Sequence, residues 1–540
     1  MTIDRTQIYH NFFTEQVELS PSINDSLNLP EFEHLKDKME NPYSTCHIEK
    51  ETALYTTYFK LMESIPKNKQ TLHDKILKDI CNTYLESLKY DLEYFPLNPL
   101  DNELTYIVDD VSGNGNFVFS KKKDYEAYIK KLDSLPEIVD SMITVMRKGI
   151  KTKNVLPKII AVDLKNQLIK TYSNKSWINI NSKKYPSLNY NKICTVILET
   201  ELIKIIDFLK KVYIPKCRNS IGMASLPNGK KKYEFLVKNM LTEHNISIDY
   251  IHQFGLLEVE RIHEEMKQIQ DILKFNGTRK QFFNYMRNRK DLKFKNKREI
   301  ISTYTNKLKY IETNLMPTLF NKKIKSKCQV LSVPTYNEEF ASEAYYQGGD
   351  LNGKRPGKFF INLKNLKDNS KIDVEALVLH EALPGHHYQI SLVNEHKDYP
   401  MFIKMYGIEA YVEGWALYCE NLGEFKTPED YFGKLVMELV RAIRLVVDTG
   451  IHYYGWSYDK TYDYIVSNGY ESTNLIESQI IRYISLPSQA LAYKIGEKCF
   501  IDCLNKFLKD GGTDIREFHE KVLEDGVVPL HMLRDKFNLE

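Results

Sequence analysis

The sequence is poor in long apolar runs, in clustered cysteines and in charge of one sign. No apolar run approaches the roughly 20 residues that a helix needs to cross a bilayer, and residues 1–8 are too polar for the apolar stretch of a signal peptide. The eight cysteines are widely spaced and form no Cys-x-x-Cys pair, which favours reduced thiols over a disulfide framework. We therefore expect a protein that is made without export, remains in the cytoplasm and has no membrane partner.

Excess charge is also absent. Lysine and arginine together number 75, against 72 for aspartate and glutamate, so the net charge is only +3. The lysines are scattered among carboxylates, and a short basic run such as Lys230–Lys232 is typical of a solvated loop. We therefore expect no nucleic acid partner. Hydrophobic residues make up 42% of the 540-residue chain, a share that excludes disorder and suits a globular protein.

Strand signals are few, and most of the chain shows the periodicity of amphipathic helices. In residues 249–273, apolar side chains recur at helical spacing with Glu and Lys between them. The clearest strand signal is Lys358–Leu363. Helices are predicted at residues 52–62, 74–92, 125–147, 194–212, 249–273, 374–380 and 432–447.

The chain shows no internal repeat and no low-complexity linker. We therefore predict a mainly α fold in which residues 1–540 form a single large helical domain. An approximate boundary near residue 320 separates a helical N-terminal half, residues 1–320, from a predicted catalytic half with the metal site, residues 321–540. A small β hairpin or sheet is expected beside the helix that carries the candidate active site.

Residues 376–389, Ala-Leu-Val-Leu-His-Glu-Ala-Leu-Pro-Gly-His-His-Tyr-Gln, concentrate the residue types that zinc chemistry uses. An apolar run leads to His380 and Glu381, and His386 and His387 follow closely. Neutral imidazoles are zinc ligands, and a neighbouring carboxylate can hold and deprotonate a water molecule. The pattern predicts a zinc site. The structural alternative is a set of capping and core histidines around a kinked helix.

The spacing of these histidines departs from the usual zincin pattern, in which the second ligand follows four residues after the first on one helical face. Position 384 is proline, and His386 lies six residues after His380. In an undistorted helix His386 would point roughly 120° away, and His387 would share the face but lie about 10 Å further along. Because Pro384 cannot donate a backbone hydrogen bond and its ring clashes with the carbonyl of His380, we expect the helix to bulge there beside Gly385. A bulge favours His386 over His387 as the second ligand, and the choice between them stays open.

A third protein ligand is needed if a water molecule is to occupy the fourth position on the metal. Glu413 lies among apolar residues on a predicted helix, where a bare carboxylate would be costly to bury. It is therefore the candidate third ligand, with a buried salt bridge as the structural alternative. Glu409, about one helical turn earlier, and Glu420 are candidates for supporting the ligands.

The motifs His380-Glu-x-x-Pro-Gly-His-His-x-Gln389 and Glu413-Gly-Trp-Ala-x-Tyr418 resemble those of the proteins grouped as domain of unknown function 885. These proteins are helical and zincin-like, and many are described as metallopeptidases. The resemblance implies a zincin-like metallopeptidase body with one zinc ion held by His380, His386 and Glu413. It covers most of the chain and extends to Gly222, Leu226–Gly229, Gly255–Met266, Arg355–Asn362, Arg444–His452, Arg482–Tyr483 and Pro487–Gly496.

Three residues in the resembling segments are candidate hydrogen-bond donors to the oxyanion of a tetrahedral intermediate. They are His452, Tyr483 and Tyr493. For His452, which follows Gly450, the structural alternative is a helix cap. The chain has 36 tyrosines, so for each tyrosine a plain core or surface position is the alternative.

Four further residues are candidates for substrate binding. The guanidinium of Arg482 suits a substrate carboxylate, which it can bind through two hydrogen bonds, and an ion pair is its structural alternative. The predicted strand Phe359–Leu363 comes where zincins place an edge strand that pairs with an extended substrate, although a plain hairpin is an equal alternative. The substrate-binding candidates are Arg355, Asn362, Arg482 and Gln489.

These patterns together predict a zinc-dependent hydrolase, a metallopeptidase that cleaves short peptides with Glu381 as general base. The expected cofactor is one Zn²⁺ ion. One alternative is a zinc amide hydrolase that acts on a non-peptide small molecule, and another is an inactive binding or structural protein on a peptidase scaffold. The sequence leaves the oligomeric state open.

Overall fold

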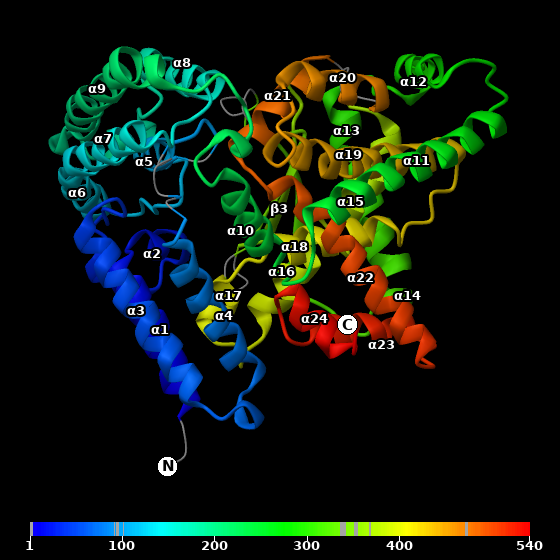
Figure 1. Ribbon diagram of the computed structural model, residues 1–540, viewed down its shortest axis with the longest axis horizontal. Helices are drawn as coiled ribbons and strands as arrows, with labels where there is room; N and C mark the ends of the chain where they lie inside the picture. Colours follow the sequence, from blue (N-terminus) through cyan, green and yellow to red (C-terminus); the bar gives the residue numbers. More distant parts are fainter. Residues whose placement is uncertain are drawn as a thin grey trace.

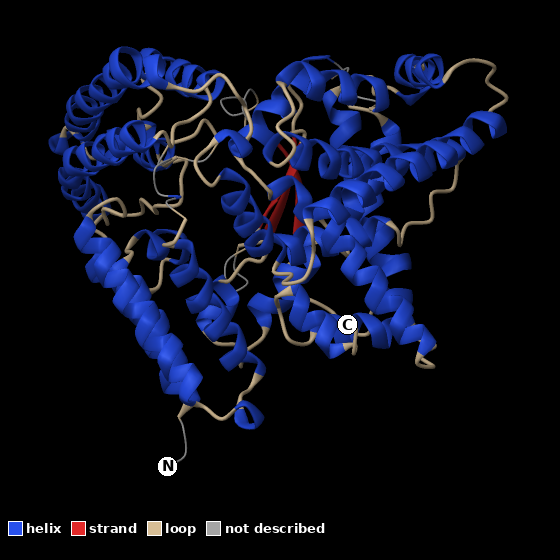
Figure 2. Ribbon diagram, in the orientation of Figure 1, coloured by secondary structure: helices blue, strands red, loops and turns tan. Residues whose placement is uncertain are grey.

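The computed structural model of the protein describes residues 4–90, 92, 97–100, 102–334, 338, 342–349, 351, 355–366, 369–469 and 473–539. Within these residues helices predominate and three strands form one small sheet (Figures 1 and 2). The prediction of a mainly α fold with a small sheet is therefore confirmed. None of the helices in this part of the chain combines the length and the apolar composition that a membrane crossing requires.

The first part of the chain forms a series of helices along one side of the molecule, drawn in blue and cyan in Figure 1. The helix predicted at residues 125–147 is interrupted by a 3₁₀ turn at Leu132–Ser134, because Pro136 stands in the first turn of a new helix. The helices are α1 (Arg5–Leu19), α2 (Ser22–Leu27), α3 (Thr45–Ser64), α4 (Leu72–Ser87), α5 (Glu103–Ser112), α6 (Lys122–Lys131), α7 (Leu135–Thr152), α8 (Lys158–Asn174) and α9 (Tyr190–Phe208).

The rest of the chain builds the region that contains the sheet. Its longest helices are α11 and α19, which pack against each other. The helices are α10 (Gly229–Leu241), α11 (Ile248–Ile272), α12 (Arg279–Asn288), α13 (Lys297–Tyr310), α14 (Met316–Leu319), α15 (Val374–Glu381), α16 (His386–Glu395), α17 (Met401–Met405), α18 (Glu409–Glu420), α19 (Pro428–His452), α20 (Tyr458–Asn468), α21 (Thr473–Ser485), α22 (Ala492–Lys509), α23 (Ile515–Leu523) and α24 (Leu530–Lys536).

The sheet has the strand order β1-β3-β2, with β1 (Cys328–Ser332), β2 (Ala344–Gln347) and β3 (Gly357–Ile361). The predicted strand is β3, and it is central, since it pairs in parallel with β1 and antiparallel with β2. Its backbone hydrogen bonds are thus used on both sides. The expectation that this strand lies at an edge and pairs with an extended substrate is therefore wrong.

Two large hydrophobic clusters fill the interior. One includes Tyr58 and Trp415, and the other includes Leu164 and Leu439, so both draw residues from before and after residue 320. The two halves of the chain therefore share their packing. Close helix contacts depend on glycine, as at Gly255 of α11, where a β-carbon would lie 2.7 Å from that of Leu445.

Candidate metal centre

The segment with the predicted metal ligands forms two helices with a sharp turn between them. α15 ends at Glu381 and α16 begins at His386. In the turn, the amide of Gly385 donates to the carbonyl of Leu379 at 2.9 Å, and a β-carbon on Gly385 would lie 1.8 Å from the carbonyl oxygen of His380. Only glycine permits so close an approach. The expected bulge is thus a complete break that starts a new helix at His386.

Trp415 fixes this turn from the neighbouring helix α18. Its indole Nε1–H donates to the carbonyl of Pro384 at 3.0 Å, and its ring is fully buried against Phe320 and Phe500. Because Trp415 lies two residues after Glu413, the helix that fixes the turn also carries the candidate third ligand.

The three predicted metal ligands meet at this break. His380, His386 and Glu413 offer ligand atoms that all lie within 4.8 Å of one another. Glu413 Oε2 is 3.3 Å from His380 Nε2 and 3.6 Å from His386 Nε2, and within the described part of the chain it has no hydrogen-bond partner of good geometry. In a tetrahedral site with bonds of about 2.0–2.1 Å, ligand atoms lie about 3.3–3.4 Å apart. The spacing and the donor set therefore fit a zinc ion.

Glu420 orients the first ligand. His380 Nδ1–H donates to Glu420 Oε1 at 2.8 Å, and both side chains are buried. Burial lowers the pKa of His380, but the neighbouring carboxylates of Glu413 and Glu420 outweigh burial and raise the pKa to about 9. Burial raises the pKa of Glu413, but the charges of His386 and His380 outweigh burial and hold this pKa well below its ordinary range. Negative charge is thus concentrated around His380 Nε2, where a divalent cation would bind.

His387 points to the sheet and away from the cluster. The hydroxyl of Tyr346 on β2 donates to its Nδ1 at 2.9 Å, and its Nε2–H donates to the carbonyl of Ser326 at 3.2 Å. Burial lowers the pKa of His387 to about 4, so the ring is neutral at physiological pH. Both ring nitrogens are therefore occupied, and the geometry brings His386 and not His387 to Glu413.

Glu381, the predicted general base, lies beside the cluster. It is 8% exposed, and its charge contributes to the raised pKa of the adjacent His380. Its carboxylate makes no hydrogen bond with any side chain that the structure describes. It is therefore available to a small molecule next to the ligands.

Tyr493 is brought to the cluster by a close crossing of α18 and α22. A β-carbon on Gly414 would lie 2.5 Å from the backbone of Gly496, so the two helices touch at these glycines. Glu413 precedes the first glycine and Tyr493 lies one turn before the second. Burial, followed by the charge of Glu413, raises the pKa of Tyr493 to about 12, which keeps the phenol protonated at neutral pH.

A chain of polar side chains continues from Tyr493. Gln489 Nε2 donates to Tyr493 Oη at 3.3 Å and to Glu409 Oε1 at 2.7 Å. Arg482 Nη2 donates to Gln489 Oε1 at 3.4 Å. Burial raises the pKa of Glu409, and the negative charge of Glu413 adds to this effect. The structure thus groups three predicted residues, Tyr493, Gln489 and Arg482, next to the candidate ligands.

The family described as "Bacterial protein of unknown function (DUF885)" matches residues 23–537. The chain belongs to the DUF885 family. None of the curated proteins matches it.

Two solved structures resemble nearly the whole of this DUF885 chain. A "putative lipoprotein" from Colwellia psychrerythraea has a TM-score of 0.86 at 22% identity, with 99% of this chain and 98% of that chain covered. A "putative lipoprotein of unknown function" from Shewanella oneidensis has a TM-score of 0.74 at 15% identity, with 98% of each chain covered. At these identities the likeness shows the fold alone.

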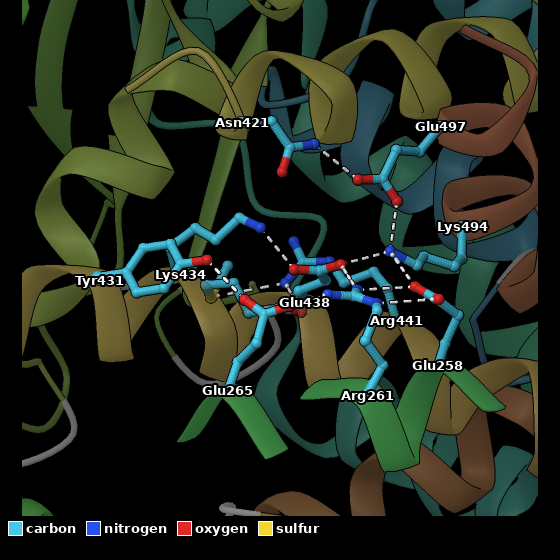
Figure 3. A network of polar contacts seen from close by, with 11 residues as sticks. Glu258, Arg261, Glu265, Asn421, Tyr431, Lys434, Glu438, Arg441, Lys494 and Glu497 are labelled. Atoms are coloured by element: carbon cyan, nitrogen blue, oxygen red, sulfur yellow. Dashed lines mark hydrogen bonds and ion pairs between the residues drawn. The ribbon is translucent and has the colours of Figure 1, made fainter. Parts of the chain in front are cut away.

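A buried charge network lies next to the end of α18 that carries Glu420 (Figure 3). Lys494 Nζ lies 2.6 Å from carboxylate oxygens of both Glu438 and Glu497. Asn421, which follows Glu420, donates from Nδ2 to Glu497 Oε1 at 2.8 Å. The network borders a cavity of about 410 Å³. Through Asn421 it also holds the end of α18, from which Glu420 reaches His380.

His452 and Tyr483 have structural positions. His452 is fully buried, its Nε2–H donates to the carbonyl of Tyr483 at 2.8 Å, and the amide of Met223 donates to its Nδ1 at 3.3 Å. Burial lowers the pKa of His452 to about 3. Arg441, which contacts Glu420, lies roughly 16 Å earlier along α19. The predicted oxyanion role of His452 is corrected to a packing role, and the buried ring of Tyr483 belongs to the hydrophobic core.

Arg355 and Asn362 flank β3, one before the strand and one directly after it. Asn362 Nδ2 donates to the carbonyl of Glu338 at 2.8 Å, and its Oδ1 accepts from the amide of Lys364 at 3.0 Å, so it organises the turn after the strand. Arg355 is exposed before the strand. Their assignment to substrate binding stays a prediction.

Sequence reasoning missed two contributors. Arg441 lies 3.7 Å from Glu420 and so borders the partner of a metal ligand, and Tyr346 holds His387 away from the cluster. Neither has a motif around it that distinguishes it from the chain's other arginines and tyrosines.

Proposed function

We propose that this DUF885 chain is a zinc-dependent hydrolase, specifically a metallopeptidase for short peptides. The observation that carries the proposal is the convergence of His380, His386 and Glu413 at ligand spacing, with Glu413 Oε2 near both imidazoles and without a hydrogen bond from the described residues. A buried glutamate with a purely structural role would satisfy both of its oxygens with hydrogen bonds, whereas a metal ligand leaves an oxygen for the ion.

The neighbouring residues support a hydrolytic role. A zinc ion held by the three ligands would lower the pKa of a water molecule and polarise a carbonyl group. Glu381 accepts the proton of the attacking water and passes it to the leaving nitrogen. Because Gln489 donates to Tyr493 Oη, the hydroxyl proton of Tyr493 is left to stabilise the carbonyl oxygen as it becomes negative.

The accessibility of the site favours slender substrates. His386 is 9% exposed and Glu381 is 8% exposed, so an extended peptide suits the site better than the surface of a folded protein does. Gln489 and Arg482 beside the ligands supply hydrogen-bond donors for the polar groups of a peptide.

The test compares three variants with the unmodified chain. The Glu381→Gln variant should bind zinc as the unmodified chain does and lose about 10²–10⁴-fold in peptide hydrolysis. The His386→Gln variant should lose the zinc ion held by His380 and Glu413, whereas His387→Gln, which alters the adjacent histidine, should keep it. Zinc is measured by elemental mass spectrometry and hydrolysis with a peptide library. Normal hydrolysis by the Glu381→Gln protein would contradict the proposal.

The same assays separate the alternatives. A zinc-loaded protein that hydrolyses no peptide of the library but cleaves small amides would be a hydrolase of a non-peptide substrate. A chain that binds no zinc and cleaves neither class would be a binding or structural protein on this scaffold.

The cytoplasmic location stays a prediction. The two structural neighbours are called lipoproteins, a name that concerns those proteins. Fractionation of cells that express the tagged chain distinguishes a cytoplasmic from a membrane-associated protein.

A further inference from the structure

A second group of metal-ligating side chains lies away from the proposed catalytic site. Asp79 comes from α4, His244 from the segment between α10 and α11, and His531 from the first turn of α24. Figure 1 shows α4 on the side of the N-terminal helices that faces α10 and α24. The group therefore joins three segments that lie far apart in the sequence.

The three side chains have the geometry of an open cation site. Their ligand atoms all lie within 4.8 Å of one another, and the rings of His244 and His531 have centroids 4.2 Å apart. Among the described residues, the Asp79 carboxylate makes no hydrogen bond and no ion pair shorter than 4.0 Å. Bound ligand atoms lie about 3.3–3.4 Å apart, so the exposed His244 side chain would close in on Asp79 and His531 when an ion binds.

Thr242 prepares the two histidines for this role. His531 Nδ1–H donates to the carbonyl of Thr242 at 2.8 Å, which leaves the lone pair of His531 Nε2 for a metal. The hydroxyl of Thr242 accepts the amide of Leu530 at 2.7 Å, so the end of α10 is fastened to the start of α24. His244 follows two residues later and is held beside His531 by the same contacts.

We propose that Asp79, His244 and His531 bind one Zn²⁺ ion that fastens α4 to α10 and α24. Two imidazoles and a carboxylate form a donor set that zinc accepts, and water completes the coordination at the exposed side of His244. The site is structural, because its three ligands come from three separate segments of the chain, on α4, after α10 and on α24. It is independent of the proposed function.

The experiment compares zinc content and thermal unfolding in four forms of the full chain. They are the unmodified protein, His244→Gln, His386→Gln and the double variant, with His10→Gln as the control for loss of an exposed histidine. Zinc should fall from about two ions per chain to about one in each single variant and to none in the double variant. The control should keep both.

Thermal unfolding gives a readout besides stoichiometry. Added zinc should raise the unfolding midpoint of His386→Gln by a few degrees and leave that of the double variant unchanged, because a ligand that binds only the folded state stabilises it. Loss of His244 should lower the zinc affinity of the second site by more than roughly 10–100-fold, which is the cost of losing a residue that only hydrogen-bonds to a metal ligand. Since His244 is exposed, circular dichroism should show the variant folded.

The outcomes separate the two sites. Equal zinc content and equal midpoint shifts in His386→Gln and the double variant would overturn the second site. If His244→Gln loses an ion and His386→Gln loses none, the second site stands and the catalytic proposal fails.

Discussion

Removing the charge of Glu420 tests whether the cluster is a metal site or a buried ion pair. The Glu420→Gln change keeps the length of the side chain. Its amide oxygen can still accept the hydrogen bond from His380 Nδ1–H, which is 2.8 Å long in the unmodified protein. The charge that makes the imidazole a stronger ligand is lost, and Arg441, 3.7 Å away, loses its carboxylate neighbour.

The magnitude follows from the position of this contact. Loss of a partner of a metal ligand costs about 10–100-fold in metal affinity, or about 1.4–2.7 kcal/mol. We expect the upper end of this range, because both His380 and Glu420 are buried and water cannot replace the carboxylate. Competition with a fluorescent zinc chelator measures the affinity.

The matched control is Glu395→Gln. Glu395 lies on α16, as His386 does, but it accepts hydrogen bonds from the amides of Lys325 and Ser326 and touches neither ligand. This variant should keep the zinc affinity of the unmodified chain. If Glu420→Gln binds zinc as tightly as Glu395→Gln does, the reasoning that His380 is a metal ligand oriented by Glu420 is refuted.

Three other predictions concern the surroundings of the site. Gly385→Ala should abolish zinc binding at His380, His386 and Glu413, because its β-carbon would lie 1.8 Å from the carbonyl of His380, and zinc retained at this site would contradict the tight turn. Lys494→Met should lower the free energy of unfolding by about 3–5 kcal/mol in urea, because buried carboxylates lose their cation, and an unchanged value would contradict this. Burial raises the pKa of Asp448 to about 7. The unfolded carboxyl titrates near about 3.9, so the folded state binds more protons and stability falls as pH rises from about 4 to about 7. The free energy of unfolding of Asp448→Asn, measured across that pH range, should not show this decline. A decline of equal size in the variant would argue against a neutral buried carboxyl in the unmodified chain.

Much of the fold could be predicted from the sequence because helical periodicity is a local property. Apolar spacing in residues 249–273 corresponds to α11 at Ile248–Ile272, and the predicted strand Lys358–Leu363 overlaps β3 at Gly357–Ile361. Boundaries were less accurate where a proline or a 3₁₀ turn divides one periodic stretch into two helices, as at Leu132–Ser134.

The sequence by itself determined which residue types are present to bind a metal, since the histidines and glutamates of the two motifs have the chemistry of zinc ligands whatever the fold. Only the tertiary structure decided which of them meet. The turn at Gly385 directs His386 to Glu413 and His387 to Tyr346, and the burial of His452 removes it from any substrate. These outcomes depend on which helix faces pack together, and the sequence pattern around each residue carries no record of its contacts with residues tens of positions away.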